Sequence, residues 1–175
     1  MTKNELVNKL THTKNNYILG LAAYSLFDSG RSYPLLQTHL AAFGQYVVTF
    51  DQVAVLLQNK KDRTIALKEF GKMLMRTFIK DSFEQIKDYC EDTGQYAAFK
   101  SQDWYEFARI IRNFLSHNCI FEFNKYDRER LPITWKEITI TETMHGQSLD
   151  LSIFNYVQTW ELFLQFEDFV QNHLK

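Results

Sequence analysis

Residues 101–118 read SQDWYEFARIIRNFLSHN and give the clearest structural pattern in the chain. Their apolar side chains recur at intervals of three and four, which is typical of the buried face of an α-helix. The residues in this stripe are Trp104, Phe107, Ala108, Ile111, Phe114 and Leu115. Ser101 or Asp103 can cap the helix N-terminus. We therefore expect an amphipathic helix that ends near Asn118.

The segments on either side of this helix also favour helices. Six glycines and two prolines are few for a 175-residue protein rich in turns and strands. Asp62 is a candidate cap for a long helix, and Gly94 is its stop. Helical patterns cover residues 4–27, interrupted by the polar residues 11–16, and residues 34–58, 62–90 and 156–174. We predict an all-α protein, a bundle of four to five helices forming a single domain over residues 1–175.

One segment departs from the helical pattern. Residues 138–141 (ITIT) and 149–152 (LDLS) alternate with period two, and the turn-like His145-Gly146-Gln147 lies between them. We expect a small β-hairpin at about residues 132–153, as an appendage to the single domain. The helix that follows is rich in aromatic residues at helical spacing, which predicts a core position rather than a dimer surface or a platform for nucleobases.

The composition excludes several functional classes. A net charge of −1 gives no overall field that attracts nucleic acid, so an RNA site would need a local basic cluster. Phosphate-binding loops, dinucleotide-binding glycine motifs and nucleophile elbows do not occur in the sequence. Two distant cysteines suggest neither a disulfide framework nor a zinc site, and the histidines lack metal-ligand spacing. We expect no metal and no cofactor.

The sequence also suggests where the protein acts. Its first residues do not have the form of a signal peptide, and no stretch reaches the roughly 20 apolar residues of a membrane span. We expect a cytoplasmic protein without a membrane partner.

The polar face of the helix near residue 110 gathers side chains that suit phosphate chemistry. Arg109, Asn113 and His117 are four residues apart, so the Asn113 amide could hydrogen-bond His117 and fix its tautomer. Arg112 lies about 140° from His117 on an ideal helix, too far for both to hold one phosphate. Either the last turn loosens at Ser116-His117, or Arg112 acts with His117 of a second copy across a two-fold axis.

The segment Arg112-Asn113-Phe114-Leu115-Ser116-His117 resembles the signature of the HEPN superfamily. That signature is an Arg, commonly followed by a polar residue, and a His after four to six intervening residues, near the end of a helix in a helical bundle. The resemblance implies a homodimeric, metal-independent endoribonuclease that leaves a 2′,3′-cyclic phosphate. Arg112 and His117 would be catalytic and Asn113 supporting, while Arg109 and Ser116 are candidate substrate-binding residues on the same polar face.

The resemblance also implies a biological role. HEPN nucleases commonly act as toxins or anti-phage effectors, and some are restrained by a nucleotidyltransferase-type antitoxin. The resemblance covers these six residues closely and residues 4–118 loosely, and the predicted hairpin lies outside it.

Other interpretations of the same residues remain open. In the simplest, the polar face is solvated, Glu106 pairs with Arg109, and His117 caps the helix C-terminus. A non-catalytic HEPN-like interaction module and a nucleotide-binding bundle are alternative functions. The basic residues at 125–130 are mixed with acidic ones, which favours a solvated loop over a phosphate-contacting edge.

Overall fold

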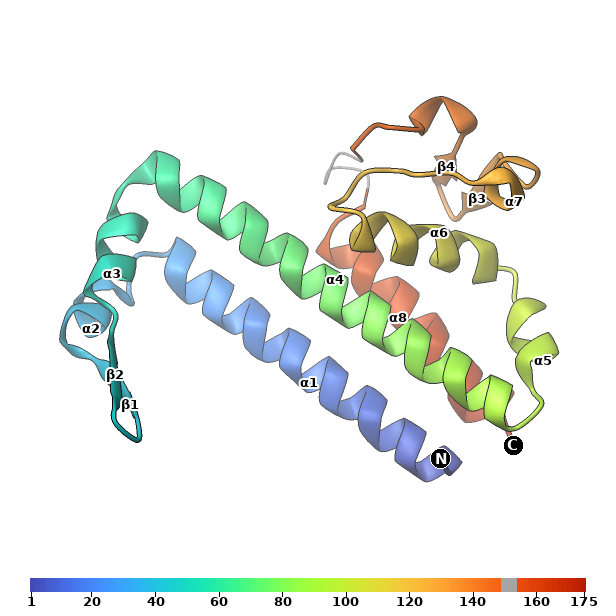
Figure 1. Cartoon of the computed structure of the whole chain (residues 1–175), viewed down its shortest axis with the longest axis horizontal. Coiled ribbons are helices and arrows are strands. Elements are labelled where there is room, and N and C mark those ends of the chain that lie inside the picture. The colour runs from blue at the N-terminus through green and yellow to red at the C-terminus, as the bar shows by residue number, and fades with distance from the viewer. Residues whose placement is uncertain (149–153) are drawn as a thin grey trace. The chain divides into compact units, whose positions relative to one another are not determined.

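The computed structural model describes residues 1–148 and 154–175 and is mostly helical (Figure 1). Within these residues it contains eight α-helices and two antiparallel two-stranded hairpins. In chain order the elements are α1 (Lys3–Asp28), α2 (Tyr33–Thr38), β1 (Leu40–Phe43), β2 (Tyr46–Thr49), α3 (Asp51–Gln58), α4 (Lys60–Asp92), α5 (Tyr96–Lys100), α6 (Tyr105–Ser116), α7 (Lys125–Arg128), β3 (Ile133–Trp135), β4 (Ile138–Ile140), the 3₁₀ turn η1 (Glu142–Met144) and α8 (Tyr156–Asn172). The predicted helical character is confirmed, and four of the helices, α1, α4, α6 and α8, have 12 or more residues.

The chain forms two compact units. The first consists of residues 1–15 and 75–175, and the second of residues 16–74. The helix that carries the Arg-Asn motif, α6, belongs to the first unit, and the β1–β2 hairpin belongs to the second. Helices α1 and α4 each contribute residues to both units.

Helix α1 is continuous, so the predicted interruption at residues 11–16 is wrong. The hydroxyl of Thr11 donates a hydrogen bond to the carbonyl of Val7 at 2.9 Å, and that of Thr13 donates to Lys9 at 3.1 Å. A side chain that bonds back to the carbonyl four residues earlier can remain in a helix. These polar residues therefore do not end α1.

The predicted helix over residues 34–58 is also wrong, because the structure places a hairpin in its middle. Strands β1 and β2 pair antiparallel, from Leu40 opposite Thr49 to Phe43 opposite Tyr46. Gly44, in the two-residue turn between them, has a φ of 60°, a left-handed conformation that glycine adopts without strain. Helices α2 and α3 flank this hairpin.

Helix α4 begins two residues earlier than the pattern predicts. The side chain of Asn59, not that of Asp62, accepts hydrogen bonds from the first backbone N–H groups, those of Lys61 (3.0 Å) and Asp62 (3.3 Å). Beyond its C-terminus, Gly94 has a φ of 69°, which agrees with the predicted stop. The cap predicted for α6 is wrong as well, since neither Ser101 nor Asp103 precedes it directly and the N-cap residue is Trp104.

An aromatic core holds the first unit together. The rings of Phe78 on α4 and Phe163 on α8 stack with centroids 4.4 Å apart, and Phe83 lies 5.1 Å from Phe99 of α5. Phe163, Phe166 and Phe169 of α8 are at most 1% exposed, which confirms the predicted core position of this helix. Figure 1 shows the C-terminal part of α4 beside α6 and α8 in this unit.

The second hairpin differs from the predicted one. Strand β4 pairs with the preceding β3, with Ile133 opposite Ile140 and Trp135 opposite Ile138, so the turn lies at Lys136-Glu137 and not at His145-Gly146-Gln147. The predicted second strand at residues 149–152 lies outside the described residues. Trp135 stacks on Phe107 of α6 at 4.9 Å, so this hairpin covers one side of the motif helix.

Among the described residues, no helix combines the length and the apolar character needed to cross a membrane.

Candidate functional site

The motif helix α6 is amphipathic, as predicted. Its apolar residues, including Phe107, Ile111 and Leu115, are fully buried, whereas Ser116 and His117 are exposed. Arg109, Arg112 and Asn113 are partly buried because other parts of the first unit pack against the polar face. The polar side chains of α6 therefore differ in their exposure to solvent, and only Ser116 and His117 are fully on the surface.

The C-terminus of α6 falls at the motif histidine. Ser116 is the last helical residue and His117 is the C-cap, with a φ of −98° and a ψ of 48°. Asn118 and Cys119 follow in left-handed conformations, and the Cys119 N–H donates to the carbonyl of Phe114 at 3.0 Å. This six-to-one bond is that of a Schellman motif, which turns the chain back on itself. The chain therefore leaves the helix at His117, but the last turn itself is not loosened, because the His117 N–H still donates to the Asn113 carbonyl at 3.0 Å.

Arg76 of α4 stabilises this helix end. Its Nε–H donates to the carbonyl of Leu115 at 2.6 Å. The last carbonyls of a helix lack intrahelical partners, and a cation there also favours the helix dipole. Arg76 therefore fixes the position of the residues immediately before His117.

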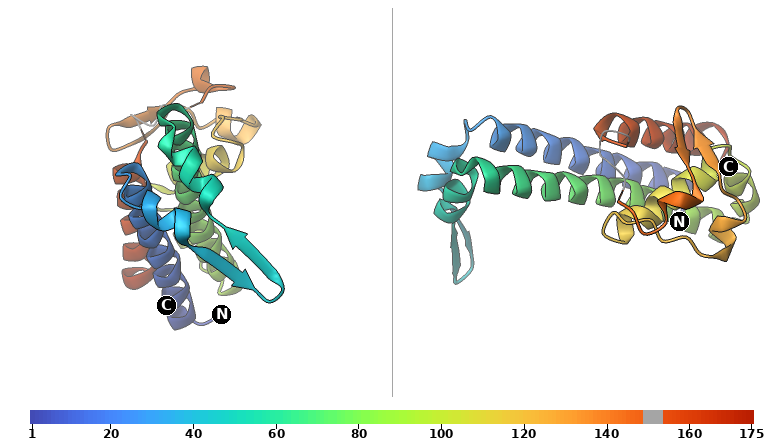
Figure 2. Two further views of the ribbon diagram at one scale, coloured as in Figure 1. Left: turned by 90° about the vertical axis from the view of Figure 1, so that its left-hand side faces the viewer. Right: turned by 90° about the horizontal axis from the view of Figure 1, so that it is seen from above.

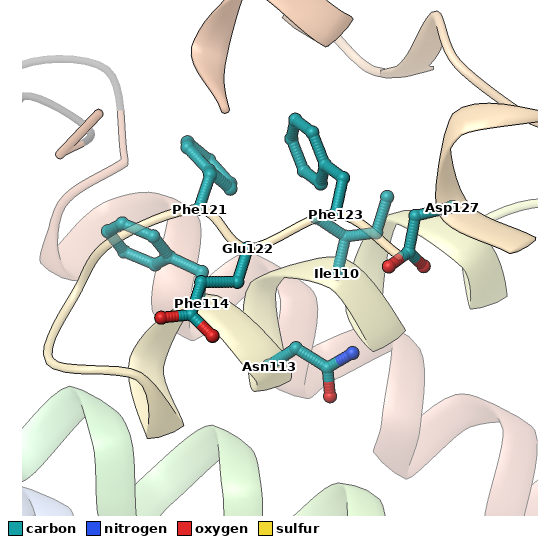
Figure 3. Close-up of a pocket in the computed structure, with 7 residues that line it drawn as sticks. All are labelled: Ile110, Asn113, Phe114, Phe121, Glu122, Phe123 and Asp127. Carbon is teal, nitrogen blue, oxygen red and sulfur yellow. The ribbon is translucent and has the colours of Figure 1, made fainter. Parts of the chain in front are cut away.

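After the turn, an extended segment passes back along the helix end and brings a carboxylate to His117. The Nδ1 atom of His117 lies 3.2 Å from Oε2 of Glu122. Figure 3 shows the rings of Phe121 and Phe123 on one side of this segment and the Glu122 carboxylate on the other. Both rings are buried, whereas the side chains of His117 and Glu122 are 52% and 60% exposed.

The segment that carries Glu122 is held by hydrogen bonds on either side of it. Phe121 makes two backbone hydrogen bonds with residues 146–147. Its carbonyl accepts from the Gly146 N–H at 2.8 Å, and its N–H donates to the Gln147 carbonyl at 3.0 Å. The N–H of Phe123 donates to Nδ1 of His145 at 3.0 Å. Glu122 is thus an exposed side chain on a fixed backbone.

Arg112 faces the opposite direction, toward α4. Its Nε lies 3.1 Å from a carboxylate oxygen of Glu84, and its guanidinium lies 5.3 Å from the ring centroid of Phe83. Within the described part of the chain the Nε–H makes no aligned hydrogen bond. One poorly aligned ion pair and a ring contact leave a guanidinium able to exchange its partner for a phosphate.

Asn113 is placed differently from what the sequence suggests. Its backbone carbonyl accepts the His117 N–H at 3.0 Å, but the partner of the imidazole is Glu122 and not the Asn113 amide. Asn113 instead lines a shallow pocket with Glu122, Asp127 and four apolar residues, too narrow to admit a water molecule (Figure 3). Asn113 therefore lines the same pocket as the carboxylate that lies beside His117.

The two candidate substrate-binding residues have partners within the protein. Arg109 contacts Glu106 at 2.8 Å and the buried Asp127 at 2.5 Å, and the Ser116 hydroxyl donates to the Arg112 carbonyl at 2.9 Å. Burial opposes the charge of Arg109, but the two carboxylates outweigh burial and raise its pKa. In this conformation Arg109 stabilises the fold through these two ion pairs. Its pair with Glu106 agrees with the simplest interpretation of the polar face.

The basic segment at 125–130, predicted as a solvated loop, contains the short helix α7 over its first four residues and a turn at residues 129–130. Asn124 and Asp127 form a reciprocal capping box at its N-terminus. Arg128 pairs with Glu142 at 2.5 Å, and Arg130 stacks on Tyr126 at 3.4 Å. Intramolecular contacts therefore occupy both arginines.

A charged ridge on α4, made of Arg76, Lys80 and Glu84, lies next to the motif. Arg76, Lys80 and Glu84 are spaced by four residues, which puts them along one side of the helix over about 12 Å. Both ends of this ridge contact α6: Arg76 bonds to the carbonyl of Leu115, and Glu84 pairs with Arg112. Lys80, between them, is exposed. These three residues carry two positive charges and one negative charge, and Lys80 is the exposed cation among them.

Sequence reasoning missed Glu122, Glu84, Arg76 and Lys80 as members of this region. Each is brought there by tertiary packing, and only the four-residue spacing on α4 could have suggested the ridge. No group of three or more His, Cys, Asp or Glu side chains among residues 1–148 and 154–175 is arranged to hold a metal ion.

Comparisons of the chain with protein-family models, with curated proteins and with solved structures found no match.

Proposed function

We propose that the first unit is a HEPN-like helical bundle and that the protein is a metal-independent endoribonuclease whose site combines Arg112 and His117 of two protomers. The observation that carries this proposal is the contact between His117 and Glu122. The two atoms lie at an ion-pair distance of 3.2 Å without an aligned hydrogen bond, and a carboxylate on this side of the ring favours a proton on Nδ1, which leaves Nε2 of the exposed imidazole as the basic nitrogen. An imidazole with an accessible basic nitrogen can act as a general base.

The reaction requires no group beyond these residues. Nε2 of one His117 accepts the proton of a 2′-hydroxyl, and the 2′-oxygen forms a bond to the adjacent phosphorus. The bond from phosphorus to the 5′-oxygen breaks, and His117, now protonated, returns its proton to that oxygen. Arg112 stabilises the negative charge that develops on the phosphorus oxygens. The products are a 2′,3′-cyclic phosphate and a 5′-hydroxyl.

Two copies are needed because the two side chains of one protomer face different partners. Arg112 points toward Glu84 on α4, whereas His117 points toward Glu122 on the segment after α6. A two-fold axis near the end of α6 would bring Arg112 of one copy to His117 of the other. Phosphate would then replace Glu84 as the partner of Arg112, and Lys80 would contact a neighbouring phosphate.

The cellular role follows from the resemblance of the motif alone. We propose a cytoplasmic toxin or anti-phage effector, with a nucleotidyltransferase-type antitoxin as its candidate partner.

Cleavage of a labelled single-stranded RNA in excess chelator tests the proposed activity. Wild-type protein should cleave it, while Arg112→Ala and His117→Ala should lose on the order of 100-fold or more in rate. Arg31→Ala and His173→Ala are matched controls at other exposed positions and should cleave normally. RNA with 2′-O-methyl groups should resist cleavage, because the nucleophile is blocked.

Mixing the two inactive variants tests the composite site. An Arg112→Ala protomer supplies His117 and a His117→Ala protomer supplies Arg112, so a mixed dimer regains one complete pair and should regain part of the activity. Failure to recover activity in dimers known to have exchanged would contradict a site shared between copies. Equal background cleavage in all proteins would reject the nuclease, and RNA binding without cleavage would favour a non-catalytic HEPN-like module.

A further inference from the structure

The extended segment that carries Glu122 pairs along one edge with the chain that follows η1. Ile120 lies opposite Ser148 in an isolated antiparallel bridge, and the N–H of Phe121 donates to the Gln147 carbonyl at 3.0 Å. Figure 1 and Figure 2 show η1 and this segment on the same side of α6. The chain after η1 is therefore the neighbour against which the Glu122 segment is aligned.

The side chain of His145 completes this pairing. In an extended segment the N–H groups of alternate residues point toward the same edge, so those of Phe121 and Phe123 face the same neighbour. The N–H of Phe121 meets a backbone carbonyl, whereas that of Phe123 meets Nδ1 of His145 at 3.0 Å. The imidazole nitrogen takes the place of a strand carbonyl, so the alignment at Phe123 depends on the identity of one side chain.

This hydrogen bond determines which nitrogen of His145 carries the proton. A ring nitrogen that accepts a hydrogen bond has no proton of its own, so neutral His145 is protonated at Nε2. His117 is the opposite case, because Glu122 favours a proton on its Nδ1. Two histidines of opposite tautomer are thus joined through Glu122, one at its carboxylate and the other at the next backbone N–H.

His145 is well placed to hold the backbone at Phe123. Apart from the bond to His145, the backbone of Phe123 has one polar contact within the described part of the chain, a longer bond of 3.3 Å from Nε of Arg128 to its carbonyl. The rings of His145 and Phe123 also lie side by side, with centroids 5.8 Å apart. His145 is exposed, and its own N–H donates to the Glu142 carbonyl at 3.1 Å. Its side chain can therefore be changed without opening the core.

We propose that His145 is a positioning residue for His117. Its Nδ1 holds the Phe123 N–H, the backbone at Phe123 places Glu122, and the Glu122 carboxylate favours the proton on Nδ1 of His117. The consequence for RNA cleavage rests on the proposed function, because it requires Nε2 of His117 to act as the base. The consequence for the tautomer of His117 does not.

Two substitutions separate the acceptor from the packing of the ring. His145→Phe keeps a flat ring beside Phe123 but has no acceptor, whereas His145→Asn keeps an acceptor oxygen near the place of Nδ1 and loses the ring. In His145→Phe, hydrogen exchange of the Phe123 amide should accelerate by at least about tenfold. The ¹⁵N chemical shifts of His117 should then indicate a mixture of tautomers. His145→Asn should stay close to wild type in both measurements.

The same samples supply the controls. His12→Phe, at an exposed histidine on α1, should change neither the Phe123 amide nor the His117 tautomer. Because His145 is exposed, both of its variants should keep the wild-type amide spectrum outside residues 117–148, which shows that they fold. In RNA cleavage, His145→Phe should lower kcat by at least about threefold with little change in KM, since Arg112 and Lys80 remain in place.

Several results would overturn the proposal. They are a proton on Nδ1 of wild-type His145, an unchanged Phe123 amide in His145→Phe, and an unchanged His117 tautomer in that variant. His145→Asn behaving like His145→Phe would overturn it as well, because the acceptor would then not be the property that matters. These measurements use no RNA, so they decide the role of His145 even if every protein fails to cleave, a result that would reject the nuclease alone.

Discussion

The Nδ1 atom of His117 lies 3.2 Å from Oε2 of Glu122, five residues later in the chain. The pair exists because α6 ends at His117 and because two left-handed residues, Asn118 and Cys119, reverse the chain direction. A carboxylate beside Nδ1 favours a proton on that nitrogen, and Glu122 is therefore the candidate to orient the ring of His117.

Replacing Glu122 with Ala should release His117 without unfolding the protein, because the Glu122 side chain is 60% exposed. The ¹⁵N chemical shifts of the neutral imidazole should indicate a proton on Nδ1 in the wild type and a mixture of tautomers in the variant. RNA cleavage should fall at least about tenfold, and Glu122→Gln, which keeps an acceptor oxygen, should fall less. Glu129→Ala is a matched control on a nearby exposed carboxylate. An unchanged tautomer in Glu122→Ala would show that the contact does not orient His117.

Lys80 should contribute to RNA affinity through a phosphate contact. It is exposed on the ridge between Arg76 and Glu84, both of which contact α6. With a 2′-O-methyl oligonucleotide, Lys80→Ala should weaken binding and reduce the slope of log affinity against log salt by about 0.7, the value for one phosphate on a single strand. Lys68→Ala, an exposed lysine on the same helix, should change neither quantity. Equal losses in both variants would mean that the ridge has no special role.

The pair between Arg109 and Asp127 should stabilise the fold rather than the reaction. Asp127 is 1% exposed and also caps α7, while the Arg109 side chain is 12% exposed. Arg109→Ala leaves the Asp127 charge buried without its cation, and Asp127→Ala removes one of the two carboxylates of Arg109 together with the cap of α7, so each should lower the free energy of unfolding by about 3 kcal/mol. The double variant should lose less than the sum of the two. Urea unfolding measures each effect, and a loss below about 1 kcal/mol in Asp127→Ala would contradict the buried pair.

Lys125→Ala provides the control for that series. Its side chain is 92% exposed, and its contact with Glu129 is long, at 4.0 Å. A surface substitution of this kind should change the free energy of unfolding by no more than about 0.5 kcal/mol.

The motif helix could be predicted because its own residues determine it. The apolar stripe from Trp104 to Leu115 fixes the buried face, and the pattern ends where the helix ends, at His117. The β1–β2 hairpin was missed although its signal is present: Gly44-Gln45 lies between aromatic residues, and β-branched residues follow. The leucines and alanines on either side of these residues hid the change from helical spacing to the alternating pattern of a strand.

Other features depend on contacts between distant segments. The partner of β4 was assigned wrongly because the turn at Lys136-Glu137 contains no typical turn residue; Lys136 adopts a left-handed φ of 51° without being glycine or asparagine. The contact of Arg112 with Glu84 joins residues 28 positions apart on different helices. No local pattern determines which carboxylate reaches a given arginine, so only the fold could identify this partner.

Tyr105 should make the stability of the protein decrease at alkaline pH. Its side chain is buried, and its hydroxyl lies 3.1 Å from that of Tyr96; burial and this hydrogen bond raise its pKa. The folded state therefore holds the proton more tightly than the unfolded state, whose tyrosines ionise at about pH 10. The stabilisation is complete below that pH and is lost as the pH rises toward the higher pKa of the folded state.

Urea unfolding of Tyr105→Phe between about pH 9 and 12 tests this sign. The variant should lose stability less steeply than wild type as the pH rises, because it has no phenol to ionise at this position. Burial also raises the pKa of Cys90, to about 12, but Cys90 is present in both proteins, so the difference between their slopes isolates Tyr105. Tyr46→Phe, at a 67% exposed position, should keep the wild-type slope. A Tyr105→Phe slope equal to that of wild type would contradict the raised pKa.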